Sequence, residues 1–115
     1  MLVCGTQKKI KGYEDLVHTA LALFQGALIP GELELIEGCC KDSADEYAET
    51  YAKQLGVKIQ HHPSTKGNYL KRNIEMVKEC DSVLCFWDGF SYGSCHTVAT
   101  AVMNNKPVKI IRLEK

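Results

Sequence analysis

The stretch Ser82-Val83-Leu84-Cys85-Phe86 runs directly into Trp87-Asp88-Gly89-Phe90-Ser91-Tyr92-Gly93-Ser94-Cys95-His96. Its first five residues form a short apolar run, which is typical of a strand covered on both faces of a sheet. The glycine- and serine-rich turn that follows leads into a segment of helical period at about residues 94–104. A buried strand that feeds a helix through a short turn is the repeating unit of α/β proteins.

The rest of the chain repeats this alternation of short apolar runs and longer helical segments. The other predicted strands are Leu2–Cys4, Leu33–Glu37, Val57–His61 and Val108–Leu113, and the other predicted helices are about Tyr13–Leu28, Ser43–Leu55 and Tyr69–Glu79. Pro30-Gly31 and Gly56 are expected to end the first two helices. We therefore predict one α/β domain over residues 1–115, a three-layer α/β/α Rossmann-like sandwich with about five parallel strands and four helices.

Composition is that of an ordinary globular domain. The 115 residues are 45% hydrophobic and 24% charged, with 14 basic and 14 acidic side chains. A chain of this size can form a core without disulfides or metal, and its apolar share argues against disorder. A net charge of zero argues against a broad nucleic-acid binder, which needs clustered Lys and Arg.

The sequence predicts a cytoplasmic protein that does not associate with a membrane. It contains no run of about 20 apolar residues, and Met1-Leu2-Val3-Cys4 lacks the features of a signal peptide. The six cysteines are therefore expected as reduced thiols, and without a CxxC pair we predict no metal site. No cofactor is predicted either. The cysteines are Cys4, Cys39, Cys40, Cys80, Cys85 and Cys95.

Ligands of such sheets bind beyond the carboxyl ends of the strands, so four loops supply the candidate residues. After the first strand, Gly5, Thr6 and Lys8 offer a tight turn, a hydroxyl and an ammonium group suited to a phosphate. After the second strand, Gly38 precedes a helix start in which Asp45 either suits the helix dipole or binds ribose hydroxyls. Asp42 or Ser43 is the expected N-cap.

The remaining candidates precede or open the last two helices. Arg72, beside Asn73, lies in a first turn where a cation opposes the helix dipole, so it is either an anion contact or a solvated surface arginine. In the turn after the fourth strand, glycines and serines offer backbone N–H groups to an anion, and aromatic rings offer faces for a base. The candidates there are Trp87, Asp88, Gly89, Ser91, Gly93, Ser94 and His96.

Together these loops resemble the small SLOG-type Rossmannoid domains, in particular the YspA-like, YpsA-related branch. Residues 38–45 are similar to that family's glycine-to-Ala-Asp motif, with Ser43 replacing the usual glycine. Arg72-Asn73 with Glu75-Met76 is similar to its Arg-Asn-x-x-Met signature. The turn from Phe86 to His96 resembles its aromatic-rich Gly-Thr-x-His loop, with Ser94 in place of threonine. The match runs from about Glu37 to Val108.

The resemblance implies a nucleotide or nucleotide-derived ligand, and the leading hypothesis is a binding or sensing module. The related LOG phosphoribohydrolases use an arginine and a glutamate. Arg72 is similar to the arginine, but Thr97 occupies the position of the glutamate. An N-glycosidase or phosphoribohydrolase that uses Asp88, Asp45 or His96 instead is one alternative, and an interaction protein without an active site is another. We also expect a homodimer, because the tyrosine-rich second helix and the aromatic residues near the end of the sheet suggest exposed apolar surface.

Overall fold

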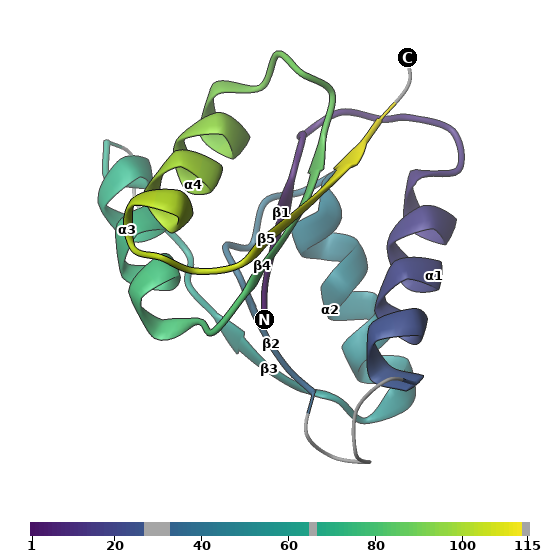
Figure 1. Cartoon of the computed structure of the whole chain (residues 1–115). Helices are drawn as coiled ribbons and strands as arrows, with labels where there is room; N and C mark the ends of the chain where they lie inside the picture. The colour runs from purple at the N-terminus through teal and green to yellow at the C-terminus, as the bar shows by residue number, and fades with distance from the viewer. Residues whose placement is uncertain (27–32, 65–66, 114–115) are drawn as a thin grey trace.

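The computed structural model, which describes residues 1–26, 33–64 and 67–113, has the predicted α/β architecture (Figure 1). Its described residues form the strands β1 (Leu2–Gly5), β2 (Glu34–Glu37), β3 (Lys58–His61), β4 (Val83–Trp87) and β5 (Val108–Arg112). They also form the helices α1 (Tyr13–Gly26), α2 (Ala44–Leu55), α3 (Tyr69–Glu79) and α4 (Tyr92–Met103). Strands and helices alternate along the chain, as the sequence predicted.

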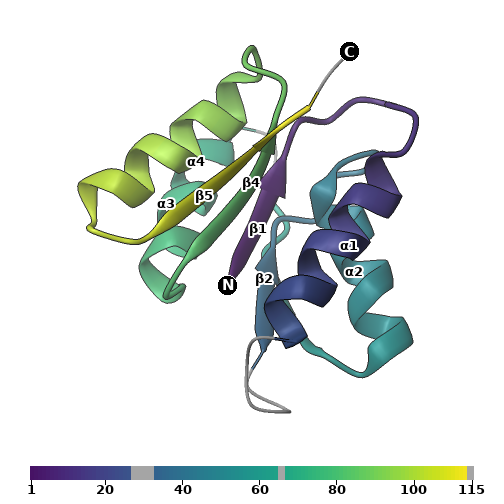
Figure 2. The same ribbon diagram turned by 45° about the vertical axis from the view of Figure 1, so that its right-hand side comes forward.

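The strands form one parallel sheet in the order β3-β2-β1-β4-β5. Helices α1 and α2 cover one face and α3 and α4 cover the other, which gives three layers (Figure 2). The chain changes direction across the sheet after β3, so the loops after β1 and β4 leave neighbouring strands toward opposite faces. This topological switch point is where ligands of doubly wound sheets commonly bind.

The core has two parts, one on each face of the sheet. Side chains of β1 and β4 supply both parts, because successive residues of a strand point to opposite faces. Leu84 and Phe86 face α1 and α2, whereas Val83 and Cys85 face α3 and α4. Burial on both faces explains why this segment is a continuous apolar run in the sequence.

Local chemistry accounts for the ends of α2. The Ser43 Oγ accepts a hydrogen bond from the Asp45 N–H at 3.1 Å, so Ser43 is the N-cap that the sequence suggested. Gly56 ends the helix in the left-handed conformation at φ 69°. Because the Val57 N–H still bonds to Ala52 O, the following strand begins at Lys58, one residue later than predicted.

The start of α4 differs from the prediction, and the predicted end of the first helix is not described. Helix α4 begins at Tyr92 rather than Ser94, since Ser91 O already accepts the Cys95 N–H. The predicted end of the first helix, at Leu28 and Pro30-Gly31, lies outside the described residues.

None of the helices in the described part of the chain has both the length and the apolar composition required to cross a membrane.

Candidate functional site

The sheet brings all the sequence-predicted site residues to one edge of the molecule, the edge where the parallel strands end. They come from the ends of β1 and β4, from the loops after β1, β2 and β4, and from the first turns of α2, α3 and α4. Within this edge they form two groups. The first lies at the switch point between β1 and β4, and the second lies beside β2 and α3.

Thr6 and Asp88 join the two loops at the switch point. The Asp88 N–H donates to Thr6 Oγ1 at 3.0 Å, and the Thr6 N–H donates to Phe86 O at 2.8 Å. Both Thr6 and Asp88 are buried. The Thr6 hydroxyl oxygen therefore accepts a hydrogen bond that holds the two loops together.

The turn after β4 is held by its own side chains. Asp88 Oδ1 accepts hydrogen bonds from the Phe90 and Ser91 N–H groups, each at 2.9 Å. The Trp87 indole N–H donates to Ser91 O at 2.9 Å. These bonds leave the rings of Phe90 and Tyr92 exposed to solvent, at 72% and 71%. The turn is thus preorganised, and two largely exposed aromatic residues lie on it.

The first turn of α4 has no side-chain cap. Ser91 is the N-cap residue, but its hydroxyl bonds to Ser94 Oγ at 3.3 Å instead of to a helix N–H. Ser94 is buried, and His96 Nδ1 is buried without a hydrogen-bond partner among the described residues. Uncapped N–H groups at a helix start are donors suited to an anion.

The four candidate glycines differ in what lies beside them. A Cβ atom added to Gly5 would lie 2.7 Å from Phe86 O, and one added to Gly38 would lie 2.8 Å from Arg72 Cζ. One added to Gly89 would lie 2.9 Å from Arg112 Nη2. At Gly93 no described atom outside its two chain neighbours and the nearby backbone of α4 lies within 4 Å of the added Cβ. Protein atoms therefore fill the space beside the first three glycines, whereas Gly93 leaves its backbone open to a ligand.

The second group is built around the buried carboxylate of Asp45. Its Oδ2 accepts the Gly38 N–H at 3.1 Å and the Cys40 N–H at 3.3 Å, which shapes the loop after β2. Burial raises the pKa of Asp45 to about 6, against a lowering by the Cys40 N–H bond and the Arg72 guanidinium. Asp45 therefore has a structural role in this loop, in addition to its favourable place at the start of α2.

Arg72 is half-buried and bonded to the backbone, in contrast to a solvated surface arginine. Its Nη1 donates to Gly38 O at 2.6 Å and to His62 O at 3.4 Å, and its Nε donates to the Asn73 side chain at 3.2 Å. The guanidinium also lies 5.8 Å from the centre of the Tyr69 ring. Arg72 thus links the start of α3 to the loops after β2 and β3.

Sequence reasoning missed three residues at the ends of β2 and β3. The carboxylate of Glu37 is fully buried and contacts His61 Nδ1 and the Cys39 N–H. The Cys39 Sγ lies 3.5 Å from Glu37 Oε1, and burial together with Glu37 raises the pKa of the Cys39 thiol to about 11. Glu37 and His61 were both predicted as final residues of strands. Their pairing follows from that prediction once the two strands are known to be neighbours.

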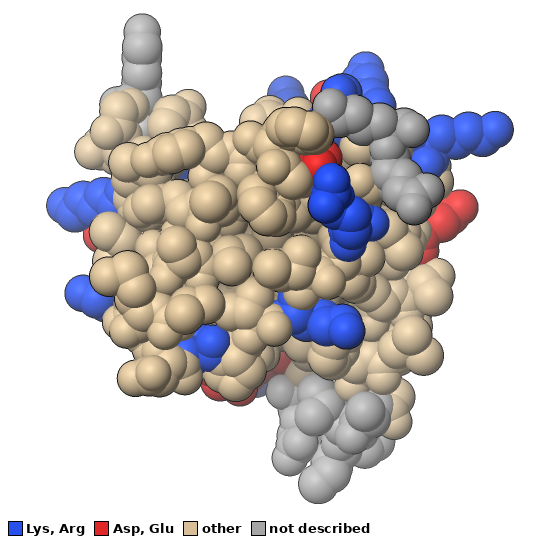
Figure 3. Space-filling model, turned by 45° about the horizontal axis from the view of Figure 1, so that its top comes forward, with Lys and Arg blue, Asp and Glu red and all other residues tan. Residues whose placement is uncertain are grey.

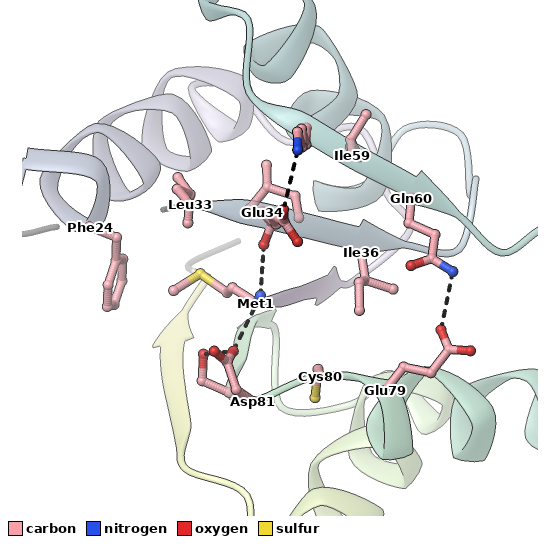
Figure 4. Close-up of a pocket in the computed structure, with 13 residues that line it drawn as sticks. Met1, Phe24, Leu33, Glu34, Ile36, Ile59, Gln60, Glu79, Cys80 and Asp81 are labelled. Atoms are coloured by element: carbon pink, nitrogen blue, oxygen red, sulfur yellow. Dashed lines mark hydrogen bonds and ion pairs between the residues drawn. The ribbon is translucent and has the colours of Figure 1, made fainter. Parts of the chain in front are cut away.

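A pocket of about 280 Å³ opens at this carboxyl edge, beside the second group. A larger one of about 740 Å³ lies at the opposite, amino edge of the sheet (Figure 4). Polar groups of the larger pocket pair with one another: the Met1 nitrogen donates to Glu34 O at 2.8 Å, and Gln60 donates to Glu79 at 3.3 Å. The smaller pocket is lined by Gln7, Gly38, Cys39, Cys40, Lys41, Pro63, Ser64 and Tyr69. We take the carboxyl edge as the candidate site because sheet topology favours it.

Charge at the carboxyl edge is mixed, with a cationic tendency. Figure 3 looks obliquely onto this edge and shows Lys and Arg side chains at several places around a largely uncharged face. Few acidic side chains are visible from this side. The edge is therefore compatible with a small anionic ligand.

Comparison with protein-family models and with curated proteins gives no match for this chain.

Proposed function

We propose that this domain binds a nucleotide or nucleotide-derived ligand at the switch point between β1 and β4. The observation that carries the proposal is the open backbone of Gly93, at the uncapped start of α4. A phosphate above this turn would accept hydrogen bonds from N–H groups that have no side-chain partner, and the helix dipole would favour its charge. The predicted resemblance to SLOG-type domains agrees with a ligand of this class.

Neighbouring side chains supply the other contacts that a nucleotide needs. The Arg112 guanidinium lies against Gly89, so a cation stands beside the turn. Tyr92 is 71% exposed, and an exposed aromatic ring offers a stacking face to a base. Lys8 lies in the neighbouring loop after β1, where its N–H donates to Asp42 O at 2.9 Å.

Binding is favoured over hydrolysis by the state of Asp88 and Asp45, two of the three groups considered for catalysis. Asp88 accepts two backbone N–H bonds, and Asp45 is buried under two more. A general acid or nucleophile has to reach the substrate, and both of these carboxylates already hold loops. The protein is therefore proposed as a binding or sensing module, cytoplasmic and dimeric, in which these residues shape the site.

The experiment is a thermal-shift screen of the wild-type protein with nucleoside monophosphates, NAD, cyclic dinucleotides and inorganic phosphate. A ligand that binds the folded state raises the melting temperature. Gly93→Val should abolish the shift, because its side chain would fill the space above the helix start. It should fold normally, since that space is empty in the protein.

Gly26→Val is the matched control. Gly26 also has no described atom within 4 Å of its Cβ position apart from its chain neighbours and the nearby backbone of α1, and it is the last residue of α1, away from the carboxyl edge. It should keep the nucleotide-dependent shift. Absence of any shift in the wild-type protein, or equal shifts in the wild type and in folded Gly93→Val, would contradict the proposal. Arg72→Ala is a poorer test, because Arg72 also holds two loops together.

A further inference from the structure

Glu37 and His61 occupy equivalent positions at the ends of two neighbouring parallel strands. In the register of the sheet, Glu37 of β2 pairs with His61 of β3. Paired residues of parallel strands project to the same face of the sheet, so their side chains meet beyond the strand ends. The contact between Glu37 Oε1 and His61 Nδ1 is thus a consequence of register.

Cys39 completes the cluster through an unusual backbone conformation. Its φ of 63° is in the left-handed region, which a residue with a side chain rarely adopts. This conformation turns the Cys39 N–H onto Glu37 Oε2 and brings Cys39 Sγ to 3.5 Å from Glu37 Oε1. A carboxylate oxygen, an imidazole nitrogen and a sulfur therefore all lie within 4.8 Å of one another.

The charge balance around Glu37 favours an added cation. Glu37 is 0% exposed, and the carboxylate of Asp45, which is also buried, lies close enough for Glu37 to raise its pKa. Among the described residues, the His61 ring is the only ion-pair partner of Glu37, and it is charged only when protonated. Arg72 is bonded to Gly38 O and His62 O rather than to Glu37. Glu37 thus has hydrogen-bond partners in the Cys39 N–H and the His61 ring, but no permanently charged partner among the described ion pairs. A buried charge is costly unless an opposite charge pairs with it.

The sulfur and one carboxylate oxygen have the separation expected of two ligands of a tetrahedral metal ion. His61 Nδ1 contacts that same oxygen and has to move away from it for both atoms to bind one ion. Zinc binds sulfur at about 2.3 Å and a carboxylate oxygen at about 2.0–2.2 Å. At a tetrahedral angle these lengths separate sulfur from oxygen by roughly 3.5 Å, which matches the distance from Cys39 Sγ to Glu37 Oε1. A thiolate with an imidazole also selects zinc-class ions over calcium and magnesium, which prefer oxygen ligands.

We propose that Glu37, Cys39 and His61 form a site for one divalent zinc-class ion at the carboxyl edge. The side chains of His61 and Cys39 are exposed, and Cys39 also lines the 280 Å³ pocket. The fourth coordination position therefore faces solvent beside this pocket, where it takes water or an anionic group of a small molecule. Three protein ligands with one open position is the arrangement of reactive rather than purely structural zinc sites.

The test uses cobalt(II) as a spectroscopic probe for the full chain, purified with a chelator and without any nucleotide. One equivalent of cobalt should produce a thiolate-to-cobalt charge-transfer band, and zinc should displace it. Cys39→Ser should abolish the band. His61→Ala should weaken cobalt binding at least about tenfold, since even a group that only orients a metal ligand typically contributes this much. Both substituted side chains are exposed, but His61→Ala also removes a partner of the buried Glu37 carboxylate. Melting curves recorded without metal therefore have to show that both variants are folded.

The neighbours of these ligands provide matched controls. Cys40→Ser and His62→Ala change the adjacent residue of the same type, and His62 Nε2 lies 2.8 Å from Glu79 instead of Glu37. Both should bind cobalt as the wild type does. Failure of the wild-type protein to bind one equivalent would overturn the proposal. So would a band that survives in Cys39→Ser but disappears in Cys40→Ser. Because no nucleotide is present, this test is independent of the proposed nucleotide site.

Discussion

Burial of a single carboxylate, that of Asp45, sets a pH dependence of stability. Its pKa is about 6 in the folded protein against 3.8 for an ordinary aspartate, so the folded state binds the proton more tightly than the unfolded state. Protonation therefore stabilises the fold. The contribution is fully present below about pH 4 and is lost as the pH rises through about 6.

Asp45→Asn should remove this dependence, because an amide does not titrate. The free energy of unfolding of the wild type, minus that of Asp45→Asn, should fall by up to about 3 kcal/mol between pH 4 and pH 7. Urea denaturation at several pH values measures it. Taking the difference cancels the titration of other groups, such as Asp81, whose pKa is lowered. A difference that stays constant across this range would show that Asp45 has an ordinary pKa.

Single residues also show the limit of sequence reasoning about this site. The sequence marks four loop glycines in the same way, as places where a ligand can approach the backbone: Gly5, Gly38, Gly89 and Gly93. Of these four, only Gly93 is open to a ligand. The other three are filled by Tyr13, Arg72 and Arg112, which are distant in the sequence. Whether a glycine admits a ligand or a side chain of the protein depends on such long-range packing, and local sequence does not contain it.

At the scale of the elements, Tyr13 connects three of them. Its hydroxyl donates to Thr6 O at 2.9 Å, in the loop after β1, and accepts the Ala44 N–H at 3.1 Å, at the start of α2. The Tyr13 ring is buried against Tyr47 and Phe86. Tyr13 at the start of α1 therefore fixes the position of α2 relative to the β1 loop.

Tyr13→Phe should destabilise the protein although the ring stays in place. The Thr6 carbonyl and the first N–H of α2 would both lose a buried partner, which typically costs about 1–3 kcal/mol. Chemical denaturation measures this change in the free energy of unfolding. Tyr92→Phe is the control, because Tyr92 is 71% exposed and should unfold as the wild type does. Equal stabilities of the two variants would mean that the Tyr13 hydroxyl does not link these elements.

The elements themselves were largely predictable, because their signals are local. Every predicted strand and helix has a counterpart in the described residues. Ser43 caps the start of α2 and Gly56 follows its last residue, both as expected. The cluster of Glu37, Cys39 and His61 was not predicted, since it depends on strand order. The pattern of apolar runs predicts that β2 and β3 exist, and the register that pairs Glu37 with His61 becomes visible only in the assembled sheet.

For the whole molecule, one of the two apolar surfaces that the sequence suggested for pairing two copies is not exposed. Phe90 and Tyr92, near the end of the sheet, are exposed as expected, but α2 is not the free surface. The tyrosines of α2 pack on α1: Tyr51 is buried, and its ring centroid lies 5.6 Å from that of His18. Helix α4 instead contains no charged residue and exposes Val102 at 62% and Met103 at 83%. Apolar side chains that lie exposed together on an uncharged helix suggest a surface that contacts another protein.

We therefore expect the homodimer to form through the exposed side of α4. Met103→Glu should convert the dimer to a monomer, because pairing would bury a carboxylate without a partner. Sedimentation velocity at tens of micromolar measures the change. Leu23→Glu is the control: Leu23 is 72% exposed on α1, in the opposite helical layer, so its charge should leave the dimer intact. A wild-type protein that sediments as a monomer would contradict dimerisation. A dimer disrupted only by Leu23→Glu would assign the contact to the α1 face.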